Sequence, residues 1–171
     1  MNMTRIFLIG YMGSGKSTVG KLLANKLGYS FIDMDAQIEA NQFKTISQIF
    51  TDLGEEKFRQ LEQKCLHEVS EFDDVVISTG GGTPCFFDNI SYMNTNGLTV
   101  YLKYSAQELA DRLGGIHVAK RPVLGNRQGE ELLQFISEGL AKREPFYAQA
   151  SYSVWGDIES EVQQIINLLD K

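Results

Sequence analysis

The residues that most clearly predict a chemistry lie near the start of the chain, where residues 10–17 read GYMGSGKS. A glycine, any four residues, then glycine, lysine and serine is the P-loop pattern, which binds polyphosphates. Backbone N–H groups of such a loop surround the phosphates, the Lys16 ammonium reaches the β- and γ-phosphates, and the Ser17 hydroxyl can hold Mg²⁺. We therefore expect a nucleotide site here; a chance match in a glycine-containing turn is the alternative.

The segments on either side of this loop favour the nucleotide site. Residues 5–9 form a short apolar run, and Val19, Leu22, Leu23 and Leu27 follow the loop at helical spacing. A strand, a glycine loop and a helix in this order point the helix N-terminus at a bound anion.

Two carboxylates follow the second apolar run. Asp33 and Asp35 come directly after residues 30–32, an expected strand. Open parallel sheets bind ligands at the carboxyl ends of their strands. One carboxylate can hold Mg²⁺ through water, because this ion prefers oxygen ligands, and the other can accept a proton from a substrate hydroxyl. The alternative is that one of them, for example Asp35, only caps the following helix.

A third pattern is the triple glycine at 80–82, which follows an apolar run and the residues Ser78 and Thr79. Many P-loop NTPases carry an aspartate at the end of this strand to organise Mg²⁺. This chain lacks it, which shifts the metal-binding role toward Asp33. Consecutive glycines let backbone N–H groups approach a ligand closely, although a glycine-rich turn without a ligand is the alternative.

Two arginines are candidates for binding an anionic group. Arg59 lies at the margin of a helical apolar stripe, and Arg143 precedes Pro145, where a helix bends or ends. The planar guanidinium suits carboxylate or phosphate because it donates two parallel hydrogen bonds. Singly, such arginines are more often solvated surface residues, and the sequence alone does not pair them. The apolar stripe consists of Phe58, Leu61, Cys65 and Val69.

Length and composition fit an ordinary soluble protein with one domain. The chain has 171 residues and a formal net charge of −6, without a block of like charge that would indicate a nucleic-acid or membrane surface. It has no apolar run of about 18 residues, and its start is too polar for a signal peptide, so we expect a cytoplasmic protein. Cys65 is expected to be a reduced core thiol, and Cys85, His67 and His117 receive no role.

Apolar runs alternate with amphipathic segments, which is typical of α/β folds with a parallel sheet. The expected strands cover residues 5–9, 30–32, 75–78, 98–102 and 152–155. The expected helices cover residues 16–27, 34–41, 45–52, 54–71, 106–112, 130–147 and 158–169. Residues 80–95 and 114–129 lack a regular pattern. We interpret the second segment as a lid, since Arg121 beside the rigid Pro122 can close over phosphates; a plain surface loop is the alternative.

Together these segments resemble the shikimate kinase family, and the resemblance covers nearly the whole chain with the motifs in the family's order. The motifs are residues 10–17, Asp33-Met34-Asp35, Gly54-Glu55-x-x-Phe58-Arg59-x-x-Glu62, the glycines 80–82, Arg121-Pro122, and Arg143-x-Pro145-x-Tyr147. Other small P-loop kinases share the first motif but not the later set.

The resemblance implies a three-layer α/β P-loop kinase fold like that of nucleoside monophosphate kinases. It implies a five-stranded parallel sheet in the order 2-3-1-4-5, with helices on both faces and a mobile lid. The chain would be a single domain over residues 1–171, with a substrate-binding region at about 34–62 and a lid at about 113–126. We expect a monomer, because no unusually apolar exposed helix stands out.

The resemblance also implies a reaction: transfer of the γ-phosphoryl group of ATP to the 3-hydroxyl of shikimate, in chorismate and aromatic amino-acid biosynthesis, with Mg²⁺ as cofactor. By motif, shikimate would contact Asp35, Arg59, Gly81, Gly82 and Arg143. ATP would contact Gly13, Ser14, Gly15, Lys16, Ser17, Thr18, Arg112 and Arg121. Ser17 and Asp33 would position Mg²⁺, and the catalytic residues would be Lys16, Asp35 and Arg121.

The chain departs from the family pattern at two places. The triple glycine is followed by Thr83-Pro84-Cys85-Phe86-Phe87, where the family often has a small residue. Residues 155–158 lack the arginine that some members place beside the adenine, so nucleotide-base selectivity stays open.

Three alternatives remain at this stage. Another P-loop metabolite kinase, such as a gluconate or nucleotide kinase, would keep the first motif, although the two arginines favour a carboxylate acceptor. A GTPase would need Asn-Lys-x-Asp and Asp-x-x-Gly motifs, which do not occur at suitable places. A partner-binding module without catalysis is disfavoured because the chain retains Lys16, Ser17, Asp33 and Asp35.

Overall fold

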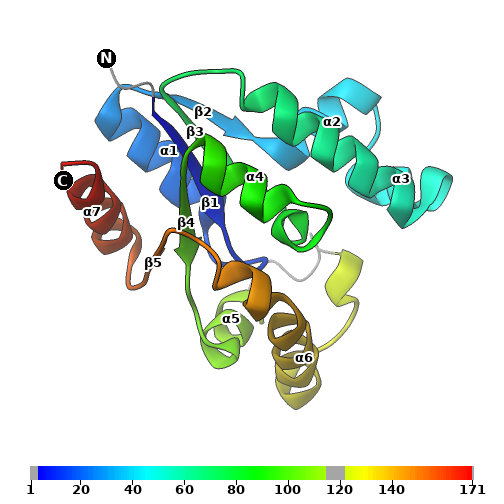
Figure 1. Ribbon diagram of the computed structural model, residues 1–171. Helices are drawn as coiled ribbons and strands as arrows, with labels where there is room; N and C mark the ends of the chain where they lie inside the picture. Colours follow the sequence, from blue (N-terminus) through cyan, green and yellow to red (C-terminus); the bar gives the residue numbers. More distant parts are fainter. Residues whose placement is uncertain (1–3, 115–121, 171) are drawn as a thin grey trace.

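A computed structural model of the chain describes residues 4–114 and 122–170 and shows one five-stranded parallel sheet (Figure 1). The order across the sheet is β2-β3-β1-β4-β5. The strands are β1 (Arg5–Ile9), β2 (Ser30–Asp33), β3 (Val75–Ser78), β4 (Leu98–Leu102) and β5 (Tyr152–Val154). The order and the parallel pairing confirm the expected sheet.

The central strands β1, β3 and β4 are buried on both faces, which is why their sequences read as continuous apolar runs. Side chains alternate between the two faces of a strand. Along β1, Ile6 and Leu8 therefore join the hydrophobic cluster on one face. Phe7 and Ile9 join the cluster on the other face.

Helices cover both faces of the sheet, which confirms the three-layer architecture. α1 (Lys16–Leu27) and α7 (Ile158–Leu169) pack on the face of Ile6 and Leu8, and they lie beside each other in Figure 1. The helices packed on the face of Phe7 and Ile9 are α2 (Met34–Gln42), α3 (Ile46–Val69), α4 (Asn89–Asn96), α5 (Ala106–Leu113) and α6 (Gly129–Tyr147).

Residues 80–95, which have no regular sequence pattern and were not assigned, contain regular structure. The short 3₁₀ helix η1 (Thr83–Cys85) and α4 occupy much of this segment. α4 was not predicted because it is only 8 residues long, and Ile90 and Met93 are its buried apolar residues. Two apolar positions are too few to establish a helical period.

The two helices expected at 45–52 and 54–71 belong to a single element, α3, with a break between them. Gly54 is the non-helical residue inside α3, with φ 79° and ψ 170°. Other boundaries differ from expectation by one residue: β2 includes Asp33, β5 ends at Val154 and α6 begins at Gly129.

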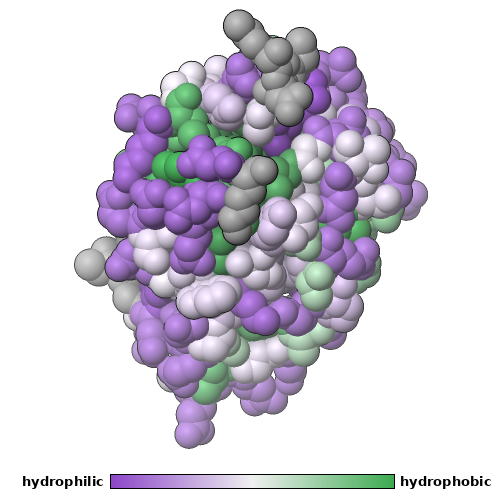
Figure 2. Space-filling model, turned by 60° about the vertical axis from the view of Figure 1, so that its left-hand side comes forward, coloured by the Kyte–Doolittle hydropathy of each residue, from purple (hydrophilic) through white to green (hydrophobic). Residues whose placement is uncertain are grey.

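The face of the molecule seen in Figure 2 is mainly hydrophilic, with apolar side chains in smaller separate areas. Within the described ranges, no helix is long and apolar enough to cross a membrane. The lid expected at 113–126 is described in part. Leu113 ends α5, and the 3₁₀ helix η3 (Pro122–Leu124) precedes α6. Arg121, Lys120 and His117 lie outside the described residues.

Candidate active site

The P-loop joins β1 to α1 and lines a cavity of about 250 Å³. Gly15, directly before α1, has a φ of 85°, in the left-handed region that favours glycine. No side chain caps the start of α1, so its first N–H groups and the positive end of the helix dipole are available to an anion. The cavity is lined by Met12, Gly13, Gly15, Lys16, Ser17, Thr18, Asp33, Asp35, Ser78, Thr79 and Gly81.

The Lys16 side chain is folded back onto the loop. Its ammonium donates hydrogen bonds to the carbonyl oxygens of Gly10 at 2.8 Å and Tyr11 at 3.1 Å. A lysine ammonium is a flexible donor with three protons, so it can exchange loop carbonyls for phosphate oxygens without rebuilding the loop. Ser14, the remaining predicted residue of the P-loop, is buried.

Ser17 and Asp33 lie at the same edge of this cavity. The Ser17 hydroxyl donates to Asp33 Oδ2 at 2.6 Å, and Asp33 Oδ1 accepts the backbone N–H of Ala36 at 3.1 Å. Asp33 is thus the N-cap of α2. The helix-capping alternative therefore applies to Asp33 and not to Asp35, which leaves the Asp35 carboxyl free for the cavity.

Asp35 occupies an environment that disfavours its charged form. Burial raises the pKa of Asp35 to about 6, and the neighbouring carboxylates Asp33 and Glu62 add to the shift, while Lys16 opposes it. A carboxylate with a pKa near 6 is ionised at neutral pH and is a stronger base than an ordinary aspartate.

A second cavity of about 350 Å³ adjoins the first, and Met12, Asp35 and Gly81 line both. Arg59 from α3 and Arg143 from α6 line this second cavity. The structure therefore brings together the two arginines that the sequence could not pair, and it places Asp35 between them and the P-loop.

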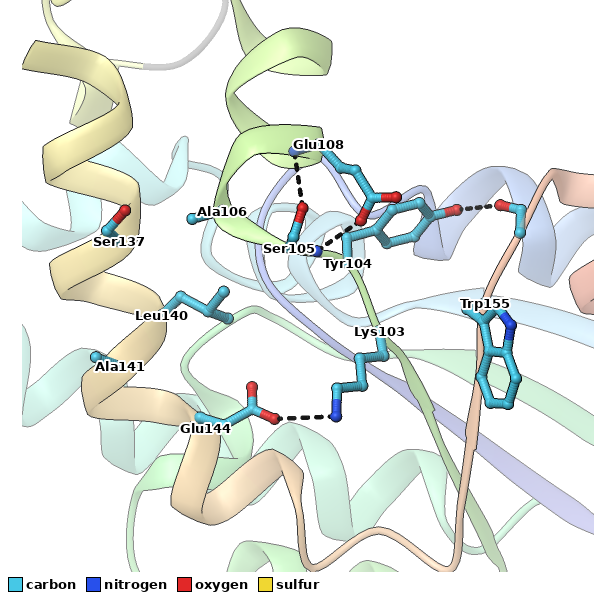
Figure 3. A pocket seen from close by; sticks show the side chains of 11 residues that line it. Lys103, Tyr104, Ser105, Ala106, Glu108, Ser137, Leu140, Ala141, Glu144 and Trp155 are labelled. Carbon is cyan, nitrogen blue, oxygen red and sulfur yellow. Dashed lines mark hydrogen bonds and ion pairs between the residues drawn. The ribbon is translucent and has the colours of Figure 1, made fainter. Parts of the chain in front are cut away.

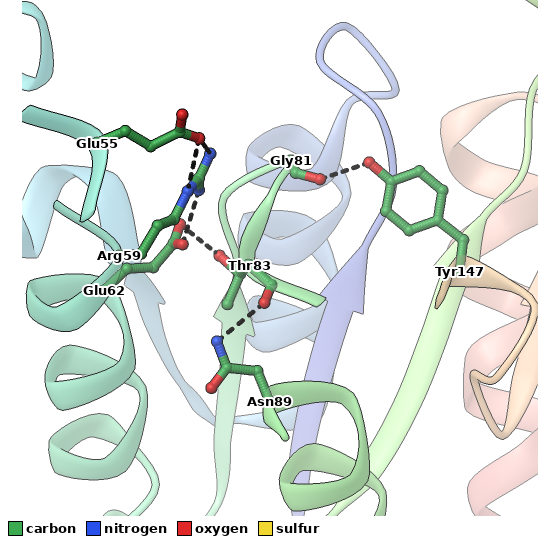
Figure 4. Close-up of polar contacts among 7 residues, drawn as sticks. All are labelled: Glu55, Arg59, Glu62, Gly81, Thr83, Asn89 and Tyr147. Carbon is green, nitrogen blue, oxygen red and sulfur yellow. Dashed lines mark hydrogen bonds and ion pairs between the residues drawn. The ribbon is translucent and has the colours of Figure 1, made fainter. Parts of the chain in front are cut away.

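The Arg59 guanidinium is held by charge and by aromatic rings. Its Nη1 donates to Glu62 Oε1 at 2.8 Å, and Glu55 accepts from Nε and Nη2 at 3.4 and 3.3 Å (Figure 4). The guanidinium carbon lies 4.0 Å from the ring centroid of Phe86. Such contacts fix the orientation of the planar fork.

Glu62 is buried, at 1% exposure, and both of its oxygens have partners. The second oxygen accepts the Thr83 hydroxyl at 2.8 Å, and the Thr83 carbonyl accepts the Asn89 side-chain amide at 2.9 Å (Figure 4). Thr83 therefore completes the support of Arg59.

The glycines at 81 and 82 make room for the arginines. A Cβ on Gly82 would lie 2.7 Å from Arg59 Nη1, and a Cβ on Gly81 would lie 3.2 Å from Arg143 Nη1. The Gly81 carbonyl accepts the Tyr147 hydroxyl (Figure 4). A side chain at position 82 would displace the Arg59 guanidinium, so glycine at this position lets the guanidinium lie close to the backbone.

The sequence prediction did not assign Glu62, Thr83 or Tyr147 to the site. Glu62 lies three residues after Arg59 on one helix, and this spacing alone could have indicated an ion pair. Nothing local marks Thr83, whose partner is distant in sequence. Cys65 is buried as expected, and burial raises its thiol pKa to about 12.

Arg112 lies beside the P-loop, and its predicted contact with the nucleotide base stays a prediction. Its Nη1 donates to the Ser14 carbonyl at 3.4 Å, and its guanidinium carbon lies 4.5 Å from the ring centroid of Tyr104.

A larger cavity of about 660 Å³ lies elsewhere, between α5, α6 and the ends of β4 and β5 (Figure 3). Lys103, Tyr104, Leu140, Glu144 and Trp155 are among its lining residues. It contains none of the predicted site residues.

The fold and the P-loop site define a P-loop kinase architecture. A solved structure of deoxyadenosine kinase from M. mycoides with bound dATP superposes with a TM-score of 0.62 at 20% identity, covering 97% of this chain and 99% of that one. At this identity the likeness concerns the fold alone.

The chain belongs to the shikimate kinase family, whose family model matches residues 12–170. The shikimate kinase of Parabacteroides distasonis is 56% identical over 172 residues, covering 99% of each chain. The solved shikimate kinase of Bacteroides thetaiotaomicron is similar with a TM-score of 0.92 and 49% identity, covering 99% of each chain. That of Acinetobacter baumannii, in complex with shikimate, gives a TM-score of 0.87 and 32% identity, covering 98% of this chain and 93% of the other.

Proposed function

We propose that this chain transfers the γ-phosphoryl group of ATP to the 3-hydroxyl of shikimate, giving shikimate 3-phosphate and ADP in chorismate and aromatic amino-acid biosynthesis. One observation carries the proposal. The cavity of Arg59 and Arg143 meets the P-loop cavity at Asp35, so an acceptor carboxylate and a donor polyphosphate would bind on opposite sides of one base.

Shikimate would bind through its carboxylate and its ring hydroxyls. Arg59 and Arg143 would hold the carboxylate with charge-assisted hydrogen bonds, and the Gly81 and Gly82 backbone would border the ring. With the carboxylate fixed at this end of the cavity, the reacting hydroxyl would face Asp35. Such positioning supplies much of the rate in phosphoryl transfer, because the reaction asks little covalent chemistry of the protein.

Lys16 and Asp35 would act on the reacting atoms. Lys16 would move from the loop carbonyls to the transferring phosphoryl group and offset its developing charge. Asp35 would orient the 3-hydroxyl and receive its proton as the oxygen attacks the γ-phosphorus and the bond to the leaving ADP oxygen breaks. Its raised pKa of about 6 suits this role.

The oxygen set at the P-loop edge fits Mg²⁺. Magnesium sites of this kind use one or two protein oxygens and complete the coordination with substrate phosphates and water. Ser17 Oγ and Asp33 Oδ2, 2.6 Å apart, provide such a pair. Among the described residues, no group of three or more His, Cys, Asp or Glu residues could hold a metal alone. When bound with ATP, Mg²⁺ would neutralise phosphate charge.

The remaining assignments concern the residues that would bind the nucleotide, the localisation, the oligomeric state and the partners. Gly13, Ser14, Gly15 and Thr18 would complete the phosphate cradle, Arg112 would pack against the base, and Arg121 would close from the lid over the phosphates. We also propose a cytoplasmic monomer that acts on small molecules without a nucleic-acid or membrane partner. The net charge of −6 supports the last point.

The direct test is a coupled ADP-release assay with ATP and shikimate, run with and without Mg²⁺, together with isolation of the phosphorylated product. We expect transfer that depends on shikimate and on Mg²⁺. Gluconate and nucleoside monophosphates serve as alternative acceptors in the same assay. Folded protein that binds ATP but transfers no phosphate to shikimate would refute the proposal.

A further inference from the structure

A carboxylate with no role in the steps above is buried in α7, on the other side of the sheet from the acceptor cavity. Glu161 has 0% exposure, and no described residue forms a hydrogen bond of normal geometry with either carboxylate oxygen, although the nearby Tyr104 hydroxyl favours the charged form. It lies next to Val162, which belongs to the apolar core. Burying a carboxylate without hydrogen bonds is costly, so its presence calls for a physical reason.

The charged and titratable groups that act on Glu161 come from three elements. Tyr104 follows β4, Arg112 lies in the last turn of α5, and Asp157 caps α7. Burial raises the pKa of Glu161 to about 7; Tyr104 and Arg112 lower it, and Asp157 raises it. The first turn of α7 adds a positive potential that favours the charged form.

Two of these groups form a stack beside the nucleotide loop. The Arg112 guanidinium lies 4.5 Å from the Tyr104 ring centroid and donates to the Ser14 carbonyl of the P-loop at 3.4 Å. The Tyr104 hydroxyl donates to the Gly156 carbonyl at 2.9 Å, a contact drawn in Figure 3. The stack therefore bridges the P-loop and the segment between β5 and α7.

This segment is one of the two places where the sequence differs from the pattern expected of the family, because some members have an arginine here. Residues 155–158 contain no arginine to contact a base, so the Tyr104–Arg112 stack has to supply the flat, cationic surface on which a base can rest. Both donors of the stack are engaged with backbone carbonyls. The charge of the guanidinium is then balanced by the nearby buried carboxylate of Glu161.

We propose that Glu161 is a positioning residue of the nucleotide site, which holds the Tyr104–Arg112 stack in the orientation that receives the nucleotide base. The inference rests on the proposed function for the identity of the nucleotide. It concerns binding of the donor only, because Glu161 lies across the sheet from Arg59 and Arg143.

Glu161→Gln keeps the size of the side chain and removes its charge. We expect KM for ATP to rise about three- to tenfold at pH 8, within the range of coupling between residues of one network, while KM for shikimate stays unchanged. Glu159→Gln is the matched control, since Glu159 lies on the same helix with its side chain 70% exposed and pairs with Lys26 at the surface. It should change neither KM.

The pH dependence of KM for ATP distinguishes a positioning role of the charged Glu161 side chain from a packing role. Glu161 is charged above about pH 7 and neutral well below it. The difference in KM for ATP between wild type and Glu161→Gln should therefore be largest at pH 8 and should vanish near pH 5.5. Titration of ATP itself is common to both proteins and cancels in the comparison. An equal difference in KM for ATP at both pH values would show a packing defect and overturn the proposal.

Binding can be measured without catalysis, because Trp155 is the single tryptophan of the chain and adjoins Gly156. We expect a fluorescence titration with ADP at pH 8 to show that Glu161→Gln binds ADP about three- to tenfold more weakly than wild type, the size expected for coupling within one network. This readout stands even if the wild-type protein transfers no phosphate to shikimate, which would refute the proposed function alone. Unchanged ADP affinity in Glu161→Gln would overturn the positioning role.

A second variant keeps the test open if Glu161→Gln does not fold. Tyr104→Phe removes the hydroxyl that joins the stack to Gly156 and keeps the ring. It should weaken ADP binding and leave KM for shikimate unchanged. Wild-type ADP affinity in Tyr104→Phe would contradict the role of the stack, and with it that of Glu161.

Discussion

Arg59 and Glu62 form an ion pair of 2.8 Å whose side chains are almost enclosed, at 12% and 2% exposure. Glu62 is held in turn by the Thr83 hydroxyl at 2.8 Å. The guanidinium is thus oriented before any substrate arrives, which reduces the ordering cost of binding a carboxylate. Arg59 and Thr83 can each be tested separately.

Arg59→Lys keeps the charge and removes the planar fork. We expect KM for shikimate to rise about ten- to a hundredfold, the loss expected for a charge-assisted hydrogen bond, with KM for ATP within about twofold. Steady-state kinetics with each substrate varied measures both values. Lys57→Ala, on the exposed side of the same helix, is the control and should change neither. An equal rise in both KM values would contradict the assignment of Arg59 to the acceptor.

Thr83→Val leaves one oxygen of Glu62 buried and unpaired. The expected loss in the free energy of unfolding is about 1–3 kcal/mol, with a several-fold higher KM for shikimate because Arg59 loses its support. Chemical denaturation and kinetics measure the two effects. Thr83→Ser retains the hydroxyl and should resemble wild type; a valine variant as stable as wild type would show that this hydrogen bond contributes nothing.

Asp35 has to be ionised to accept the hydroxyl proton, and its pKa is raised to about 6. The kcat/KM for shikimate at saturating ATP should therefore fall as pH drops through about 6 and should level off above it. Asp35→Asn should slow turnover by about 10²–10⁴ and remove this inflection. If the inflection persists in the asparagine variant, a different group controls the pH dependence.

Lys16→Ala removes the donor that offsets charge on the transferring phosphoryl group. Turnover should fall by about 10² or more, while shikimate affinity, measured by calorimetry, stays near the wild-type value. Lys21→Ala, on the exposed side of α1, is the control. A nearly normal rate in Lys16→Ala would contradict the P-loop role.

Glu161 also predicts a pH-dependent stability. Its pKa is raised from 4.5 to about 7 by burial, so the folded protein holds this proton more tightly than the unfolded chain. The stabilisation by this proton is therefore present at low pH and is lost as pH rises from about 4.5 through 7. Relative to wild type, Glu161→Gln should gain about 1–3 kcal/mol of unfolding free energy between pH 5 and pH 8.

Denaturation curves at the two pH values measure this gain. A variant that binds nucleotide less well while its relative stability rises would show that the carboxylate is kept for binding at a cost in stability. Parallel stability changes in wild type and variant would show that Glu161 titrates in the fold as it does in the unfolded chain.

The parts of the site that could be predicted are local in sequence. The P-loop is contiguous, and Asp33 and Asp35 directly follow a strand, so each pattern carries its own structural context. The three central strands followed from apolar runs that are buried on both faces. The order of its strands came from the family resemblance, because apolar runs do not specify which strands are neighbours.

The parts that could not be predicted depend on packing between distant segments. Arg59 and Arg143 meet only because α3 and α6 approach the same cavity, which no local pattern encodes. The role of Thr83 depends on Glu62, which lies 21 residues away in the sequence. α4 was missed because its few apolar residues give too short a periodic signal.

Asp33 accepts a hydrogen bond with each carboxylate oxygen, one from Ser17 in the P-loop and one from the first turn of α2. Asp33 thereby links α2, the helix that carries Asp35, to the P-loop. A displacement of Ser17 on ATP binding would act on α2 through the Asp33 side chain. If ATP and the acceptor are coupled through this contact, reciprocity requires that each changes the affinity of the other by the same free energy.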